Sequence, residues 1–162
     1  MKSTSHIADK IFTNESIAFQ VNRWRLKNKK IVFTNGVFDI LHEGHIASLS
    51  EAASHGDILI VGLNADASVK RLKGESRPVN NEHSRAILLA SLLITDAVIL
   101  FEEDTPLNII KLIMPDVLVK GGDYTIEQIA GAKEVIANGG EVKIASILQG
   151  FSTTAIIEKM KK

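Results

Sequence analysis

Ile31-Val32-Phe33-Thr34 is a short apolar run rich in β-branched residues, and the stretch that follows it has the spacing of a helix. The apolar side chains of that stretch recur at i, i+3 and i+7, at Ile46, Leu49 and Ala53. A second apolar run of the same kind covers residues 58–62. A strand, a helix and a further strand in this order predict two parallel strands joined by a right-handed crossover.

The same alternation continues to the end of the chain. Further apolar runs cover residues 97–101, 117–119 and 142–145. Thr105-Pro106 predicts an N-cap with proline at the first helical position. Thr125-Ile126-Glu127-Gln128 is typical of a capping box, and Gly139-Gly140 is expected to close the helix that it opens.

Near-continuous apolar strands indicate a sheet that is covered on both faces. The sequence therefore predicts an α/β fold, a Rossmann-like three-layer sandwich with a five-stranded, mainly parallel sheet. Residues 1–28 precede the first strand, and Ile17, Val21 and Trp24 give them a mixed helical pattern. We expect them to form an N-terminal helical extension packed on the main domain, residues 29–162.

Composition excludes several classes of function. Lys plus Arg and Asp plus Glu number 19 each, so the net charge is zero, whereas nucleic-acid-binding domains usually carry a basic excess. The absence of cysteine excludes disulfides, thiolate metal sites and a cysteine nucleophile, and it fits a reducing cytosol. No apolar run approaches the roughly 20 residues that span a bilayer. We expect a cytoplasmic protein that binds neither nucleic acid nor membrane.

The candidate site follows the first predicted strand, where the sequence is Thr34-Asn35-Gly36-Val37-Phe38-Asp39-Ile40-Leu41-His42-Glu43-Gly44-His45. Ligands of open parallel sheets bind beyond the carboxyl ends of the strands. Gly36 permits a close approach of the backbone to a ligand, and the helix that follows offers free N–H groups to an anion. Neither G-x-G-x-x-G nor a P-loop motif occurs in the chain.

His42 and His45 are three residues apart at the start of a helix, so their rings project from one face. Gly44 leaves room between them for a phosphate to lie against the backbone. With an ordinary pKa near 6.5, each ring can carry positive charge beside a polyphosphate. A zinc site is the less favoured interpretation, because the metalloprotease motif needs histidines at i and i+4 and a third ligand.

Gly36-Val37-Phe38-Asp39 followed by His42-Glu43-Gly44-His45 closely resembles the HxGH motif of the cytidylyltransferase-like nucleotidyltransferases. Four further motifs follow in order, from about Lys29 to the end of the chain: 71–80 (RLKGESRPVN), 101–106 (FEEDTP), 119–124 (VKGGDY) and 150–154 (GFSTT). The set is most similar to the adenylyltransferase domain of the ADP-heptose synthase family. The resemblance implies a nucleotidyltransferase of the HUP fold class that joins ATP to D-glycero-β-D-manno-heptose 1-phosphate and releases pyrophosphate.

The resemblance also implies roles for individual residues. His42, His45 and Lys73 would be catalytic, and Lys70 and Arg85 are further candidates for phosphate contacts. The expected nucleotide-binding residues are Asn35, Gly36, Val37, Phe38, Asp39, Gly44, Lys120, Gly122, Asp123, Ser152, Thr153 and Thr154. Related glycerol-phosphate cytidylyltransferases carry an arginine before the last of these motifs, whereas residues 147–149 here have no basic side chain, which leaves the γ-phosphate contact unassigned.

Mg²⁺ is the cofactor that this resemblance implies, held mainly by substrate oxygens and water, with Asp39 as the nearest carboxylate that could contact it. The partners implied are ATP, a sugar 1-phosphate, and a separate sugar kinase that makes this phosphate, and homodimers are common in the family. The product would enter surface glycolipid assembly, such as the lipopolysaccharide inner core.

Other functions remain open at the level of sequence. The acceptor and nucleotide could be glycerol or choline phosphate with CTP, or FMN with ATP, because backbone contacts that sequence hides select the base. A non-catalytic nucleotide-binding module is the alternative of another class. Taken singly, three motifs also have purely structural interpretations. These are a strand-to-helix turn at Gly121-Gly122-Asp123, a helix cap at Ser152-Thr153-Thr154 and a solvated helix face at 70–73.

Overall fold

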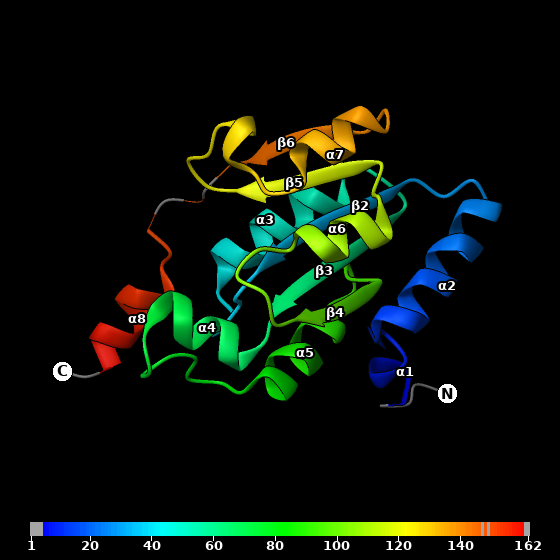
Figure 1. Ribbon diagram of the computed structural model, residues 1–162. Helices are drawn as coiled ribbons and strands as arrows, with labels where there is room; N and C mark the ends of the chain where they lie inside the picture. Colours follow the sequence, from blue (N-terminus) through cyan, green and yellow to red (C-terminus); the bar gives the residue numbers. More distant parts are fainter. Residues whose placement is uncertain (1–4, 147, 149, 161–162) are drawn as a thin grey trace.

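Six parallel strands form one sheet, with the order β1-β4-β3-β2-β5-β6, in the computed structural model, which describes residues 5–146, 148 and 150–160 (Figure 1). The strands are β1 (Ile11–Phe12), β2 (Ile31–Gly36), β3 (Ile58–Asn64), β4 (Ala97–Phe101), β5 (Val117–Gly121) and β6 (Glu141–Ala145). The helices are α1 (Ser5–Ala8), α2 (Asn14–Leu26), α3 (Glu43–Ala53), α4 (Asp66–Lys73), α5 (Glu82–Ala90), α6 (Leu107–Ile113), α7 (Ala132–Ala137) and α8 (Thr153–Met160), with a 3₁₀ turn η1 (Ile126–Gln128).

All five strands predicted from the apolar runs are present, and the Rossmann-like α/β class is confirmed. The sixth strand, β1, was not predicted, because two residues are too few to show a periodicity. It pairs with β4 through Ile11↔Val98 and Phe12↔Ile99, so the N-terminal extension is joined to the edge of the main sheet. The predicted helix of the extension is α2, whose Ile17 and Val21 are buried.

Two helix predictions need correction. The helix expected from Thr125 to Gly139 is divided, because the capping box opens only the 3₁₀ turn η1 and Ile129 then adopts an extended conformation. Gly131, with φ of +84°, starts the separate helix α7. At the other helix, Pro106 occupies the N-cap position itself, so α6 begins one residue later than expected. Residues 1–4 of the predicted extension, and Ile147 and Gln149 of the segment without basic side chains, lie outside the described residues.

Three aspartates fix how the strands are aligned with one another. Asp57, Asp96 and Asp116 each stand immediately before a strand, and each carboxylate accepts a backbone N–H at the start of the neighbouring strand. The three bonds are 2.7–2.8 Å long, to the N–H groups of Lys30, Leu59 and Ile31. Because the amino ends of β2, β3, β4 and β5 are tied in this way, their carboxyl ends meet at one edge of the sheet.

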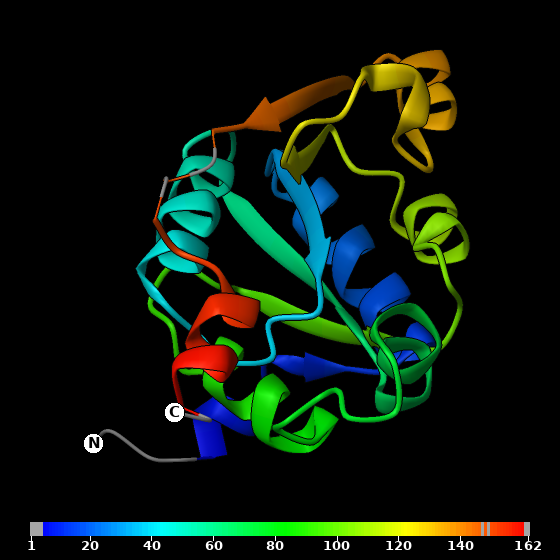
Figure 2. The same cartoon turned by 90° about the vertical axis from the view of Figure 1, so that its left-hand side faces the viewer.

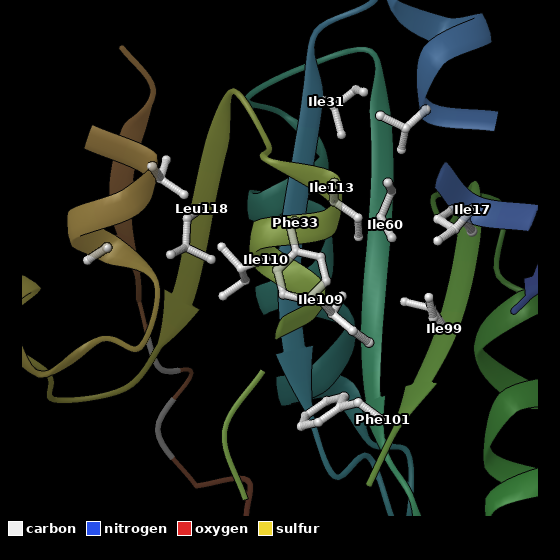
Figure 3. Packing of buried hydrophobic residues seen from close by; sticks show 14 of the residues in the cluster. Ile17, Ile31, Phe33, Ile60, Ile99, Phe101, Ile109, Ile110, Ile113 and Leu118 are labelled. Carbon is white, nitrogen blue, oxygen red and sulfur yellow. The ribbon is translucent and has the colours of Figure 1, made fainter. Parts of the chain in front are cut away.

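The sheet separates two apolar cores. One face packs against α2, α6 and α7, and Figure 3 shows Phe33, Ile60 and Ile110 among its buried side chains. The opposite face packs against α3 and α5, through Leu49, Ala52, Ala86 and Leu89. Neither core covers the carboxyl ends of the strands. Helices α4 and α8 lie at that end of the sheet (Figure 1). Turned by 90°, the two helices stand on either side of the loop that follows β2 (Figure 2).

Truncation of a core leucine tests this layering. Leu59 of β3 is 1% exposed, so Leu59→Ala removes buried surface and leaves a cavity, and we expect it to lower the free energy of unfolding by about 2–5 kcal/mol. Leu93 is 96% exposed, and Leu93→Ala is therefore a matched control expected to change stability by less than about 0.5 kcal/mol. Urea denaturation followed by circular dichroism measures both, and equal effects of the two substitutions would contradict the assigned core.

Candidate functional site

A cavity of about 400 Å³ opens where β2 and β5 end side by side. This is the point at which the strand order reverses, since the chain runs outward from β2 to β3 and β4 on one side and to β5 and β6 on the other. The loop after β2, the first turn of α3, the end of α4 and the start of α8 form its walls. Of the predicted site residues, all but Asp123, Lys70 and Arg85 line this cavity.

His42 and His45 are stacked at the entrance to α3. Their ring centroids are 3.8 Å apart with an interplanar angle of 16°. His42 is the N-cap residue, and its Nδ1 accepts the backbone N–H of His45 at 3.3 Å. Since Nδ1 is the acceptor, the proton of neutral His42 resides on Nε2, which is thus a donor for a ligand. Nδ1 of His45 is buried without a hydrogen-bond partner among the described residues.

In the unliganded site both histidines favour the neutral form, and the positive charge beside a polyphosphate stays a prediction. Burial lowers the pKa of His45 to about 4, and the neighbouring His42 contributes to the same lowering. Burial also lowers the pKa of His42. Phe38 packs edge-on against His45, with centroids 5.2 Å apart, and contributes to this apolar surrounding. At neutral pH the unliganded pair therefore consists of two neutral imidazoles rather than two cations.

Asp39 holds the loop of residues 77–80 in place, and neither of its carboxylate oxygens is free to bind a metal ion. The residue is 1% exposed, and its carboxylate accepts hydrogen bonds from Arg77 Nε at 2.6 Å and from the backbone N–H groups of Val79 and Asn80. Burial raises the pKa of this carboxyl, but the three donors together hold it below its usual value. Each oxygen accepts two bonds, so the magnesium contact expected for Asp39 is corrected to a structural role.

Arg85 also has a structural role. Its side chain is fully buried and donates to the carbonyls of Val37, Asn64 and Asn80 and to the Asp66 carboxylate, over 2.7–2.9 Å. The phosphate contact expected for Arg85 is excluded in this arrangement, because a side chain without exposed surface cannot reach a ligand. Its hydrogen bonds instead brace the loop after β2.

The two lysines of α4 differ in position. Lys73 is the last residue of the helix, is exposed and lines the cavity, whereas Lys70 lies one turn earlier and does not line it. Both lysines lie on this helix, in agreement with the helix face considered for residues 70–73. Lys73 therefore stays a candidate for a phosphate contact, and the prediction for Lys70 loses its geometric support.

Lys120, at the end of β5, is the most buried amine of the site. Its Nζ donates to Asn35 Oδ1 at 3.2 Å and lies 5.6 Å from the centre of the Tyr124 ring. Burial lowers its pKa from the ordinary lysine value. Gly122 has φ of +122°, a backbone conformation that favours glycine, and it lines the cavity, whereas Asp123 is exposed outside it.

The start of α8 closes the cavity on the side opposite α4. Ser152, Thr153 and Thr154 line it, and Phe151 stacks on His42 with centroids 6.1 Å apart. Gly44 lies between these groups, where an added Cβ would come within 2.9 Å of the Phe151 Cβ and 3.1 Å of His42 Nδ1. His42 and Phe151 thus lie so close to Gly44 that a side chain there would not fit, and the phosphate expected against this backbone stays a prediction.

Arg77 and a second cavity were not predicted. Arg77 belongs to the motif of residues 71–80, but nothing in that motif distinguishes a ligand-facing arginine from a structural one. The second cavity, of about 380 Å³, shares Asn35, Lys73, Lys120 and other walls with the first. Polar side chains on its far side are Asn64, Asp104, Thr105 and Gln128. A cavity formed by residues so far apart in the chain has no local sequence signal.

Comparison with known proteins finds a match to the sequence profile described as cytidylyltransferase-like, over residues 33–159. The bifunctional protein HldE of Rhodopseudomonas palustris (strain BisB5) is 54% identical over 155 residues, which is 95% of this chain and 32% of the relative. The HldE proteins of Nitrobacter winogradskyi and Shigella sonnei are 59% and 53% identical, over 84% and 94% of this chain and 28% and 32% of theirs. The chain thus spans about a third of the length of these relatives.

Two solved structures share the fold. The lipopolysaccharide core biosynthesis protein of Thermoplasma volcanium is 33% identical with a TM-score of 0.59, over 74% of this chain and 97% of that one. Pantoate-beta-alanine ligase of Francisella tularensis, solved with an ATP analogue and beta-alanine, gives a TM-score of 0.60 at 16% identity, over 93% of this chain and 76% of that one. In the described part of the chain, no helix is long and apolar enough to cross a membrane.

The lowered pKa of His45 predicts how stability depends on pH. The unfolded chain, with a histidine pKa near 6.5, binds more protons than the folded chain between pH 6.5 and pH 4. The free energy of unfolding should therefore fall by up to about 3 kcal/mol as the pH drops through this window. His45→Gln should flatten the dependence, whereas His83→Gln, at an exposed position outside the cavity, should not. Urea denaturation from pH 4 to pH 8 measures the slopes, and parallel curves for all three proteins would contradict the burial of His45.

Proposed function

The chain belongs to the cytidylyltransferase-like family, and we propose that it transfers AMP from ATP to D-glycero-β-D-manno-heptose 1-phosphate, giving ADP-heptose and pyrophosphate. The resemblance first seen in the motifs is confirmed by the HldE relatives, of which this chain corresponds to the part with the HxGH motif. The observation that carries the proposal is the cavity at the switch point, which is lined by two histidines at a helix N-terminus and by two lysines.

The arrangement suits an in-line displacement at the α-phosphorus of ATP. An oxygen of the sugar phosphate would form the new bond to phosphorus as the bond to the β-phosphate oxygen breaks, and the electron pair would leave with pyrophosphate. No side-chain nucleophile is needed. Catalysis then rests on positioning and on donors aimed at the charge that develops on the phosphoryl oxygens. The Nε2–H group of His42 and the N–H groups at the start of α3 are such donors.

Lys73 and Lys120 line both cavities, so the reacting phosphates would lie between them. ATP would occupy the cavity of His42 and His45, with the Ser152–Thr154 segment and Gly122 as further contacts. The sugar of the acceptor would occupy the second cavity, where amide, hydroxyl and carboxylate groups can bond its hydroxyls. Its phosphate would point toward the shared wall.

The residues described here do not form a magnesium site of their own. They contain no group of three or more acidic or histidine side chains arranged to hold a metal, and Asp39 is saturated. Mg²⁺ would therefore enter as the counter-ion of ATP, bound by phosphate oxygens and water. A sugar kinase must supply the 1-phosphate, in the cytoplasm where ATP is available, and the homodimer expected from the family stays a prediction.

Pyrophosphate release by the purified protein tests the substrate pair. We expect release with Mg·ATP and heptose 1-phosphate, and none with CTP and glycerol 3-phosphate or choline phosphate, or with ATP and FMN. A coupled phosphate assay after pyrophosphatase treatment measures it, and mass spectrometry of the product identifies ADP-heptose. Release with another pair would keep the mechanism and replace the substrate. Nucleotide binding without release from any pair would favour the binding module instead.

Removal of one histidine tests its part in catalysis. His45→Ala removes a donor from the phosphate site, and turnover should fall by about 100- to 1000-fold. The control is His83→Ala, which removes an exposed histidine of α5 that does not line either cavity. Thermal melting confirms that both variants fold. A near-normal rate for a folded His45→Ala protein would contradict the proposed role.

A further inference from the structure

Arg77 lies in the wall of the cavity with part of its guanidinium unpaired. It follows α4 in the chain, lines the first cavity, and its side chain is only 14% exposed. Nε donates to Asp39 Oδ2 at 2.6 Å. Across the residues that the structure describes, neither of its two Nη atoms has a hydrogen-bond partner, although a nearly buried arginine usually has several.

The bond to Asp39 orients this unpaired edge. The carboxylate is itself held by the backbone N–H groups of Val79 and Asn80, so the guanidinium plane is fixed by a saturated anchor. A planar fork of donors held in one orientation matches two oxygens of a phosphate group better than a flexible ammonium does. The geometry is therefore that of a prepared anion contact.

The other arginines near the site do not offer this contact. Arg85 is fully buried and uses its three nitrogens on carbonyls and on Asp66. Arg71 is bound to Asp104 and to the Glu102 carbonyl, and it lines neither of the two cavities described above. Arg77 is the arginine that lines the first cavity.

Its position relative to the lysines indicates which phosphate it meets. Lys73 and Lys120 line both cavities and mark the reacting phosphates, whereas Arg77 lines the first cavity alone. It thus stands on the nucleotide side, away from the acceptor. We infer that Arg77 binds the β- and γ-phosphates of ATP and holds pyrophosphate as it leaves, an assignment that rests on the proposed adenylyltransferase function.

Binding of inorganic pyrophosphate and of AMP separates this role from a structural one. Isothermal titration calorimetry with Arg77→Gln should show a Kd for Mg-pyrophosphate about 10- to 100-fold higher than for the unsubstituted protein, as expected for loss of a charge-assisted contact. The Kd for AMP, which lacks the β- and γ-phosphates, should change by less than about 2-fold. Arg77→Lys keeps the positive charge but loses the planar fork of donors. Its Kd for Mg-pyrophosphate should therefore lie between those of the unsubstituted protein and Arg77→Gln.

Arg71→Gln is the matched control, since it removes the same charge outside both cavities and should leave both Kd values unchanged. Thermal melting shows whether each variant is folded. If Arg77→Gln does not fold, the test is made with Arg77→Lys instead. Equal weakening of AMP and pyrophosphate, or no change in either, would overturn the inference. If the unsubstituted protein forms ADP-heptose while the pyrophosphate Kd is unaffected in Arg77→Gln, the inference fails and the function stands. If the unsubstituted protein binds neither ligand, both fail.

Discussion

The guanidinium group of Arg85 is fully buried at the carboxyl end of the sheet, where it joins four segments of the chain. It donates to the carbonyl of Val37 in the loop after β2, to Asn64 at the end of β3, to Asn80 in the loop after α4, and to Asp66 at the start of α4. Burial of a charge is tolerable only when its hydrogen bonds are satisfied, so these segments can take few other arrangements. The loop that carries the histidines and the helix that carries Lys73 are thereby held together.

Buried polar residues around the cavity are held in place by hydrogen bonds in the same way. Asp39 pins the loop of residues 77–80 and Arg77, and His42 caps the helix from which His45 projects. The Nη atoms of Arg77 have no partner among the described residues, and Arg77 lines the cavity. The histidines are neutral before a ligand arrives, because burial makes charging them costly. A polyphosphate would supply the missing negative charge and raise both pKa values, so donors would strengthen only when substrate is present.

Sequence predicted the features that repeat locally or form compact motifs. The five longer strands appear as apolar runs, and the HxGH segment places two histidines and a glycine within one helical turn. The roles of Asp39 and Arg85 could not be predicted, because their partners lie up to 41 and 48 residues away and a structural charge near a phosphate site looks the same in sequence as a ligand-binding one. The aspartates before β3, β4 and β5 were missed for a related reason, since each acts on a neighbouring strand and not on its own. The divided helix after residue 125 shows the limit of cap signals, which mark where a helix starts and not how far it continues.

The two cavities give the proposed reaction its direction. In an in-line displacement the attacking oxygen and the leaving oxygen lie on opposite sides of the phosphorus, so a single enclosed pocket would not separate them. Here Asn35, Gly36 and Val37 form a wall common to both cavities, with Lys73 and Lys120 beside it. Lys120 is held against this wall by Asn35, and burial lowers its pKa. Since water is the competing nucleophile in any phosphoryl transfer, a lysine that supplies charge from a buried position favours the sugar phosphate over hydrolysis. In the proposed reaction, the end of β2 would thus set both where the charge is neutralised and from which side the acceptor approaches.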